Sequence, residues 1–210
     1  LMLGDHRDLH SFPTRRSSGR GHNLLPLYAL ALGKPSDFFD PYFTDPIMWS
    51  RNAYYPPVKP DENQFGIAPH CDHSFLTMLP LAEEPGLQIL DGNGNWILPD
   101  PVENGIVVNT GEFLNLWSNG RFLPTPHRVV APKHDRYAIA TFFNPDSGTS
   151  SKALDTCVSA DNPAKFEPTT MQAYVEHYID SITRENGRRR VGKDVEHGGR
   201  RIIKKKKHKQ

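Results

Sequence analysis

Residues 69–77 read Pro-His-Cys-Asp-His-Ser-Phe-Leu-Thr, and this stretch indicates the fold most directly. It places His70 and Asp72 two positions apart, with Cys71 between them. Alternate residues of a β-strand point to the same face, so the spacing predicts that His70 and Asp72 share one face while Cys71 points away. The stretch therefore predicts a strand that presents two metal-binding side chains on one side of a sheet.

Two residues further along the chain complete the pattern. His127 supplies a second imidazole, and Arg136 follows nine residues later. Two imidazoles and one carboxylate are the ligands of the facial triad, which holds non-haem Fe(II) and leaves coordination positions open for oxygen chemistry. A ligand from a distant strand would close one face of such a site. Arg136 would add a fixed cation suited to a carboxylate group.

The length and composition suit a single domain with a substantial core. The chain has 210 residues, of which 37% are hydrophobic. No apolar run approaches the ~18 residues of a membrane span and no secretory signal is visible, so we expect no membrane partner. Cys71 and Cys157 are the only cysteines and neither belongs to a Cys-x-x-Cys motif, which favours a reducing, cytoplasmic location. No phosphate-binding glycine motif supports nucleotide binding.

Both ends of the chain differ from its middle. Residues 1–18 lack hydrophobic periodicity and contain a run that resembles the translation of a DNA-sequencing adapter, so we expect a non-native leader; a natural disordered leader is the alternative. Residues 188–210 hold eleven Lys or Arg and two Asp or Glu, a net +9 in a chain of +1, which leaves −8 on residues 1–187. We expect a disordered tail rather than a nucleic-acid or membrane contact, since the tail has no aromatic residue to stack on bases. The single domain is assigned to residues 19–187.

Short apolar runs separated by turn residues predict about eight β-strands. Among them, residues 106–109 read Ile-Val-Val-Asn and predict a fully apolar core strand, and residues 91–94 form a hairpin signal. This regular spacing is typical of a sandwich or jelly roll. The strands are expected at residues 52–55, 66–70, 74–81, 86–90, 95–98, 106–109, 122–130 and 137–143.

Helices are expected on either side of these strands. Leucines recur at helical spacing over residues 22–32, and Gly33-Lys34-Pro35 predicts the end of that helix. Shorter helices are expected at residues 36–40 and 112–117. Residues 169–186 form an amphipathic pattern whose apolar stripe should pack against the sheet. The predicted fold class is therefore mainly β with flanking helices.

Six motifs occur in a familiar order and at familiar separations. They are Tyr55-Pro56-Pro57, residues 69–77, Pro85 to Ile89, Asn109 to Glu112, Thr125 to Val129 and Arg136-Tyr137-Ala138. On these motifs, residues 22–186 resemble the isopenicillin N synthase-like branch of the Fe(II)/2-oxoglutarate-dependent dioxygenases. The resemblance implies a double-stranded β-helix (jelly roll, cupin-like) core, an Fe(II) site and the use of O2. Such enzymes usually have an extension before the first core helix, so we expect an N-terminally truncated member.

The resemblance also assigns roles to individual residues. His70, Asp72 and His127 correspond to the iron ligands, although each histidine alone would more often be an ordinary core or surface residue. Arg136 corresponds to the residue that pairs with the distal carboxylate of 2-oxoglutarate; the alternative is a surface arginine. Tyr55 corresponds to a tyrosine that helps to hold the same co-substrate, and its alternative is a core aromatic. No acid-base residue beyond the metal ligands is predicted.

Two positions depart from the family pattern. The pattern has Arg-x-Ser, but position 138 is Ala, so a hydroxyl that assists the arginine is missing. The family also often has Asn two residues before the matched tyrosine, where this chain has Ala53 with Asn52 beside it. Loss of one such hydrogen bond costs on the order of 1–3 kcal/mol, about tenfold to a hundredfold in 2-oxoglutarate binding. The departures leave the iron ligands intact and bear on the co-substrate.

The favoured function is an Fe(II)- and 2-oxoglutarate-dependent oxygenase that hydroxylates or desaturates a small organic molecule. The alternatives are an iron oxidase of the same fold that needs no 2-oxoglutarate, a non-catalytic metal-binding β-sandwich, and an inactive fragment. His73 and Phe143 are candidates for the substrate pocket; for His73 the alternative is a polar turn residue, and for Phe143 it is a core aromatic. We expect a small-molecule substrate, no nucleic-acid partner and a monomer.

Overall fold

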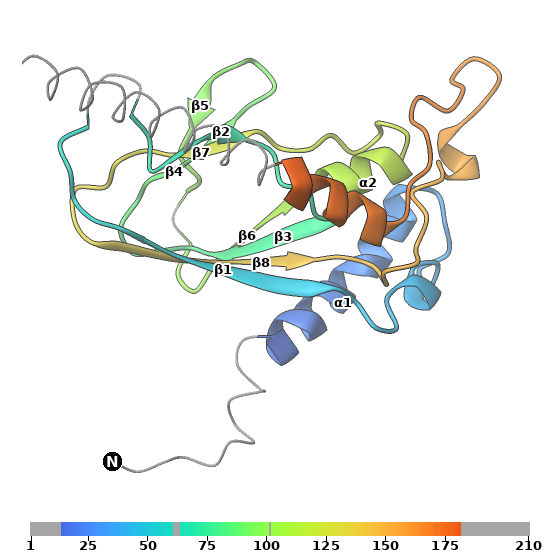
Figure 1. Ribbon diagram of the computed structural model, residues 1–210, viewed down its shortest axis with the longest axis horizontal. Coiled ribbons are helices and arrows are strands. Elements are labelled where there is room, and N and C mark those ends of the chain that lie inside the picture. Colours follow the sequence, from blue (N-terminus) through green and yellow to red (C-terminus); the bar gives the residue numbers. More distant parts are fainter. Residues whose placement is uncertain (1–13, 61–63, 101, 182–210) are drawn as a thin grey trace, which may run out of the picture. The chain divides into compact units, whose positions relative to one another are not determined.

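The computed structural model describes residues 14–60, 64–100 and 102–181, and its strands form two antiparallel sheets (Figure 1). Each sheet has four strands: one has the order β1-β8-β3-β6 and the other the order β2-β7-β4-β5. The strands are β1 (Met48–Tyr55), β2 (Ile67–His70), β3 (Leu76–Pro80), β4 (Leu87–Leu90), β5 (Trp96–Ile97), β6 (Ile106–Thr110), β7 (His127–Val129) and β8 (Arg136–Phe143).

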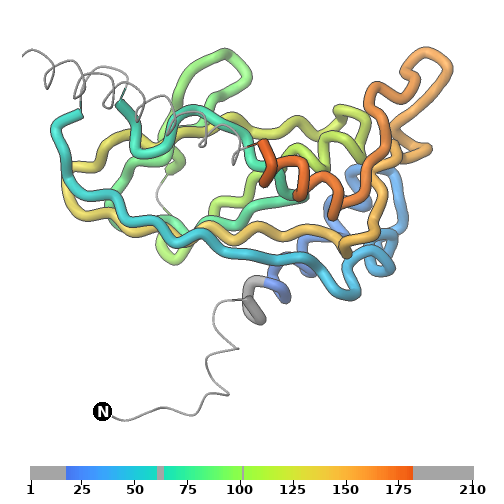
Figure 2. Tube along the Cα trace, in the orientation of Figure 1, coloured from blue at the N-terminus to red at the C-terminus, as the bar shows by residue number. Residues whose placement is uncertain are grey.

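Strands that follow one another in the sequence mostly lie in opposite sheets. The chain passes from β1 to β2, from β2 to β3 and from β3 to β4 by changing sheet each time, and it does so again at β6, β7 and β8. Only β4 and β5 form a local hairpin within one sheet. The two sheets face each other (Figure 2), and residues of both line a cavity between them. This arrangement confirms the predicted jelly-roll, double-stranded β-helix fold.

The packed apolar core lies against α1 (Thr14–Ala31) and α2 (Glu112–Trp117) rather than between the two sheets. Helix α1 contacts β1, β8 and β3, so it covers that sheet on the face away from the interior. Aromatic rings fill the space beneath it, in edge-to-face and stacked pairs with centroids 5.0–6.2 Å apart. Because this core stabilises the sheet from outside, the space between the sheets stays available for a site. The buried rings are Phe39, Phe43, Phe75, Phe113, Trp117 and Phe143.

The observed helices match the sequence in type more closely than in bounds. Helix α1 begins at Thr14, eight residues before the predicted start, and ends at Ala31. Gly33 has φ +73°, which confirms the predicted stop because only glycine takes this conformation readily. The short helix expected at residues 36–40 is instead a 3-10 turn, η1 (Asp40–Tyr42). Helix α2 coincides with the predicted residues 112–117.

One strand is less buried than its sequence predicts. The apolar run of β6 was expected to be fully buried, but Val108 is 38% exposed. Val107 and Asn109 line the interior cavity, so successive β6 residues point to opposite faces of the sheet. The expectation was wrong because β6 is the edge strand of its sheet and helix α1 packs mainly on the other three strands.

The chain divides into two compact units, Leu1–Met171 and Gln172–Gln210. Residues 171–181 are helical, within the predicted 169–186 helix, and residues 182–186 lie outside the described residues. The packing of that helix and the 19–187 domain bounds therefore stay predictions. Of the expected leader only residues 14–18 are described, as part of α1, and the 188–210 tail lies outside the described residues. Among the helices described, none combines the length and apolar character needed to cross a membrane.

Gly111 lies where two segments of backbone come closest, just after β6. A Cβ at this position would lie 2.0 Å from the carbonyl oxygen of Ser74, inside any tolerable contact. We therefore expect Gly111→Ala to lower the free energy of unfolding by about 3 kcal/mol, because backbone rather than a flexible side chain must move. Chemical denaturation measures this. Gly92→Ala is the matched control: no atom lies within 4 Å of its Cβ, so its change should stay within about 0.5 kcal/mol. Equal stability of the two variants would contradict the close approach.

Candidate metal centre

Three side chains from separate parts of the chain meet at one point. His70 ends β2, His127 begins β7, and the two residues are partners in the register between these strands. Asp72 lies two residues beyond the end of β2. One ligand-type atom from each residue lies within 4.8 Å of those of the other two. Within the part of the chain that the structure describes, this is the one group of this kind.

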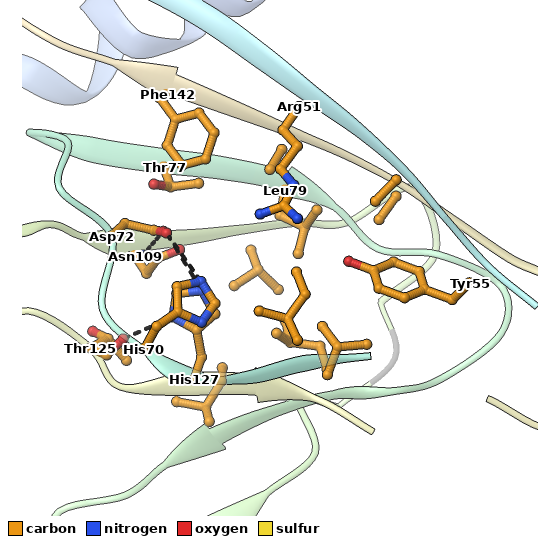
Figure 3. A pocket seen from close by; sticks show the side chains of 18 of the residues that line it. Arg51, Tyr55, His70, Asp72, Thr77, Leu79, Asn109, Thr125, His127 and Phe142 are labelled. Carbon is orange, nitrogen blue, oxygen red and sulfur yellow. Dashed lines mark hydrogen bonds and ion pairs between the residues drawn. The ribbon is translucent and has the colours of Figure 1, made fainter. Parts of the chain in front are cut away.

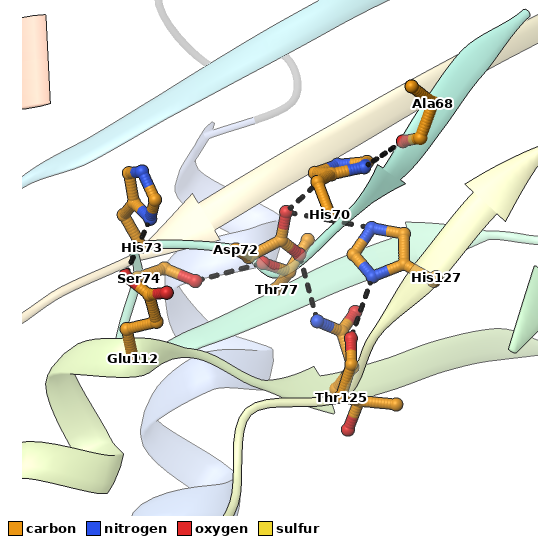
Figure 4. Close-up of polar contacts among 10 residues, drawn as sticks. Ala68, His70, Asp72, His73, Ser74, Thr77, Glu112, Thr125 and His127 are labelled. Atoms are coloured by element: carbon orange, nitrogen blue, oxygen red, sulfur yellow. Dashed lines mark hydrogen bonds and ion pairs between the residues drawn. The ribbon is translucent and has the colours of Figure 1, made fainter. Parts of the chain in front are cut away.

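The spacing of these atoms suits a bound divalent ion. Asp72 Oδ1 lies 3.8 Å from His70 Nε2 and 3.6 Å from His127 Nε2 (Figure 4). Two atoms that each bind an ion at about 2.1 Å can be at most about 4.2 Å apart, and both distances fall inside this limit. Two imidazoles and one carboxylate on one side of an ion are the ligand set of the non-haem iron triad.

Each imidazole is oriented by a hydrogen bond at its far nitrogen. His70 Nδ1 donates to the carbonyl oxygen of Ala68 at 2.9 Å, and His127 Nδ1 donates to that of Thr125, also at 2.9 Å. A carbonyl oxygen only accepts, so each Nδ1 carries the proton and each Nε2 keeps a free lone pair. Support of this kind is usual for metal-binding histidines and turns both lone pairs toward a shared ion.

The carboxylate is held equally firmly. Asp72 is only 6% exposed, and Asn109 Nδ2 donates to its Oδ2 at 2.8 Å. The Asp72 carbonyl accepts a backbone hydrogen bond from Glu112 at the start of α2. The outer oxygen and the backbone are thus fixed, while Oδ1 faces the two imidazoles. A nearly buried carboxylate without a cation nearby would be costly, so this arrangement favours a metal ion.

The electrostatic setting favours the form of His70 that binds metal. Burial lowers the pKa of His70, and the neighbouring His127 and Arg51 act in the same direction. The hydrogen bond to Ala68 and the charge of Asp72 oppose this and raise it. The net lowering keeps the imidazole neutral, and a neutral imidazole is what coordinates a metal ion.

His70 and Asp72 do not lie on one strand as the sequence predicted. His70 and Asp72 were expected to alternate on a single strand, but β2 ends at His70 and residues 71–73 form a loop. Asp72 reaches the site because that loop is tied to α2 through the Asp72–Glu112 backbone hydrogen bond. The predicted trio is confirmed as a spatial cluster, whereas the strand geometry that suggested it applies only to His70.

A cavity that is partly open to solvent extends from the three side chains between the two sheets (Figure 3). Its walls are mostly apolar, with a few polar groups, a composition typical of small-molecule sites. The residues that line it include Arg51, Ala53, Tyr55, Leu79, Leu87, Ile89, Val107, Asn109, Thr125, Val129, Arg136, Ala138, Ala140 and Phe142 as well as the trio.

Arg136 and Tyr55 form the end of the cavity away from the trio. They are direct partners in the β1–β8 register, and the guanidinium carbon lies 5.1 Å from the centre of the Tyr55 ring. Arg136 is only 3% exposed, and burial lowers the pKa of its guanidinium. Its Nε donates to the Glu84 carbonyl at 3.2 Å, while its buried Nη1 has no hydrogen-bond partner among the described residues. A buried cation with a free donor suits a carboxylate ligand.

The two departures from the family pattern both lie in the cavity wall. Ala53 and Ala138 are direct partners across β1 and β8, and both line the cavity. Each lies two residues along its strand from the Tyr55–Arg136 pair, so both pairs are on the same face of the sheet. The amide and the hydroxyl of the family pattern are therefore absent from the part of the cavity wall where a ligand of Arg136 would lie.

Neither residue suggested for the substrate pocket lines the cavity. Phe143 is fully buried on the opposite face of β8, where its ring stacks on Phe43 with centroids 5.0 Å apart. Its neighbour Phe142 lines the cavity instead. His73 Nδ1 lies 2.9 Å from a carboxylate oxygen of Glu112, beside the site but not in the cavity wall. Phe143 therefore does not belong to the wall of this cavity, and a place for His73 in a substrate pocket stays a prediction.

Sequence reasoning also missed two residues of the site. Asn109 belonged to a recognised motif but received no role, although it fixes the Asp72 carboxylate. Arg51 received no attention, yet it lines the cavity. Both carried a signal: Asn109 ends an apolar run, and Arg51 precedes Tyr55 by four residues and so shares its strand face.

Comparisons with known proteins agree with this site. The family model of the 2OG-Fe(II) oxygenase superfamily matches residues 46–145. The 1-aminocyclopropane-1-carboxylate oxidase homolog 11 of Arabidopsis thaliana is 37% identical over 163 residues, which cover 76% of this chain and 44% of that protein. Among solved structures, a full-length Neurospora crassa protein in complex with alpha-KG aligns with a TM-score of 0.73 and 28% identity, over 79% of this chain and 55% of that one.

A second solved structure aligns as well. A 2OG-Fe(II) oxygenase family protein from Caulobacter crescentus gives a TM-score of 0.74 at 28% identity, over 87% of this chain and 67% of that chain. The chain spans less than half the length of the Arabidopsis relative, so it corresponds to one part of that protein.

Proposed function

We infer from the match over residues 46–145 that this chain belongs to the 2OG-Fe(II) oxygenase superfamily, and from that premise we propose that the protein is an Fe(II)- and 2-oxoglutarate-dependent oxygenase of small organic molecules. One observation carries the proposal. A metal-binding trio and a buried arginine with a free donor stand at opposite ends of a single cavity. One molecule can therefore contact both a metal ion and a cation, as a 2-oxo dicarboxylate requires.

Separate groups of residues would bind the metal ion and the co-substrate. His70, Asp72 and His127 would hold Fe(II), and Arg136 with Tyr55 would hold the far carboxylate of 2-oxoglutarate. When bound, iron and 2-oxoglutarate supply the oxidising chemistry: substrate, 2-oxoglutarate and O2 give hydroxylated substrate, succinate and CO2. The apolar cavity walls keep bulk water away from the reacting groups.

Turnover of 2-oxoglutarate tests the proposal without knowledge of the substrate. We expect the chain to form succinate from 2-oxoglutarate under air when Fe(II) is supplied, at the slow rate of a reaction uncoupled from substrate. A chelator such as EDTA should stop it, because the trio then loses its ion. Measuring succinate by NMR checks this. Absence of succinate from an iron-loaded protein that binds substrate-sized molecules would contradict the proposal.

A second candidate is an iron oxidase that needs no 2-oxoglutarate. Ala53 and Ala138 favour it, because they remove two polar groups from the co-substrate end of the cavity. O2 uptake separates the candidates: the oxidase consumes O2 with its substrate alone, and the favoured enzyme does so only after 2-oxoglutarate is added. A purely structural metal site is less favoured, since three protein ligands leave coordination positions open.

Restoring the missing hydroxyl should strengthen co-substrate binding. We expect Ala138→Ser to lower the Kd of 2-oxoglutarate about tenfold, because a hydroxyl beside Arg136 adds a hydrogen bond to a charged group. Titration calorimetry on the iron-loaded protein under nitrogen measures this. Ala140→Ser is the matched control, since Ala140 lines the same wall one alternation further from Arg136 and should leave the Kd unchanged. An equal gain in both variants, or in neither, would argue against co-substrate binding at Arg136.

We also infer a finer placement for the protein. The six motifs of the sequence support the isopenicillin N synthase-like branch within the superfamily. Cys71 and Cys157 are both free thiols, which supports a reducing, cytoplasmic location. A monomer is proposed as well, and sedimentation of the purified protein tests it.

A further inference from the structure

Arg51 is a second arginine in the cavity. It lies on β1 on the same face as Ala53 and Tyr55, and its partner in β8 is Ala140. Figure 3 shows its guanidinium reaching from β1 into the cavity beside Leu79, between Asp72 on one side and Tyr55 on the other. Within residues 14–60, 64–100 and 102–181, its side chain makes no hydrogen bond or ion pair.

Arg51 belongs to the metal end of the cavity rather than to the Arg136 end. Four residues separate it from Tyr55, the register partner of Arg136, and four strand residues span about 13 Å. The two arginines are therefore placed to bind different groups.

The charges of the cavity leave Arg51 unmatched. This step rests on the proposed function. The formal charges of a divalent ion, Asp72, 2-oxoglutarate and Arg136 together sum to zero. Asp72 is the only carboxylate among the described residues that line the cavity, so no second carboxylate of that wall neutralises Arg51. Arg51 is a solvent-exposed residue of the cavity wall, so an anion that enters the cavity can reach its guanidinium and offer matching acceptors.

We propose that Arg51 binds a carboxylate of the primary substrate, so that the protein oxidises organic monocarboxylic acids. The acid group would pair with the guanidinium while the apolar body of the substrate lies along Leu79, Val107 and Phe142. Arg51 is then a specificity-determining residue: it holds the acid at the metal end and takes no part in holding the far carboxylate of 2-oxoglutarate.

Binding of matched probes tests this without turnover. The protein is loaded with redox-inert Zn(II) and saturating 2-oxoglutarate, and NMR measures the affinity of phenylacetate, 3-phenylpropanoate and hexanoate beside their uncharged primary amides. We expect the acids to bind at least tenfold more tightly than the amides. Arg51→Gln should remove this preference, and Arg51→Lys should retain part of it. Arg121→Gln is the matched control, because Arg121 is exposed and lies outside the cavity wall.

Two results would overturn the proposal. One is an equal affinity for acids and amides in the unaltered protein, or a preference that survives Arg51→Gln. The other is a tenfold loss of 2-oxoglutarate affinity in Arg51→Gln, which would assign Arg51 to the co-substrate.

Failure of the proposed function gives a different result, since the unaltered protein would then not bind 2-oxoglutarate. In that case the acid–amide comparison is made without 2-oxoglutarate in Arg136→Gln, where Arg51 is the remaining arginine of the cavity wall, and it still decides the role of Arg51.

Discussion

Replacing Asp72 with alanine is expected to lower the affinity of the protein for Fe(II) by a factor of about 100 or more. Changes to groups that merely support a metal ligand typically cost 10–100-fold, and loss of the only carboxylate ligand should exceed that range. The two remaining imidazoles give too few ligands for a facial triad. Anaerobic equilibrium dialysis with a metal indicator measures the change.

Two further variants should show an intermediate and a negligible loss of Fe(II) affinity. Asn109→Ala should cost about 10–100-fold in Fe(II) affinity, because the carboxylate loses the hydrogen bond that fixes its outer oxygen. Glu112→Gln should change the affinity less than threefold, since Glu112 pairs with His73 beside the site without belonging to the trio. Fe(II) affinity that survives Asp72→Ala would show that iron binds elsewhere.

Arg136→Gln is expected to raise the Kd of 2-oxoglutarate about a hundredfold while leaving Fe(II) affinity unchanged. The guanidinium offers the far carboxylate charge-assisted hydrogen bonds, each worth about 1.5–3 kcal/mol, and it is nearly buried, so water cannot replace it easily. Glutamine keeps a donor but loses the charge and the fork geometry. Anaerobic calorimetry measures the Fe(II) constant on the metal-free variant and the 2-oxoglutarate constant on the iron-loaded variant.

Arg128 provides the matched control for Arg136. It lies on β7 between two cavity residues, His127 and Val129, and its side chain points away to stack on Trp96 and bond to Gln88. Arg128→Gln should therefore leave the Kd of 2-oxoglutarate unchanged. If both arginine variants bind 2-oxoglutarate as tightly as the original protein, the co-substrate does not lie against Arg136.

The sequence predicted which residues form the site better than it predicted how the fold positions them. His70 and His127 are 57 positions apart, and no local pattern shows that β2 and β7 pair with these two residues opposite each other. Asp72 reaches the site from a loop held by α2, which strand periodicity does not describe. The residue types therefore identified the chemistry, while the tertiary pairing supplied the geometry.

Two errors could have been avoided with the strand period alone. Once Arg136 is placed in the cavity, residues 138, 140 and 142 of β8 must share its face, so Phe142 rather than Phe143 belongs to the wall. The same rule places Arg51 with Tyr55 on β1. The early start of α1 was not predictable in this way, because residues 14–18 lack the hydrophobic periodicity that indicated a helix over residues 22–32.

The most direct test of the account is the absorption spectrum of the protein with Fe(II) and 2-oxoglutarate under nitrogen. Fe(II) alone should give no visible band, and added 2-oxoglutarate should produce the charge-transfer band of its complex with iron. His127→Ala should abolish the band, because the trio then loses a ligand. Normal Fe(II) binding with no band at millimolar 2-oxoglutarate would contradict the account.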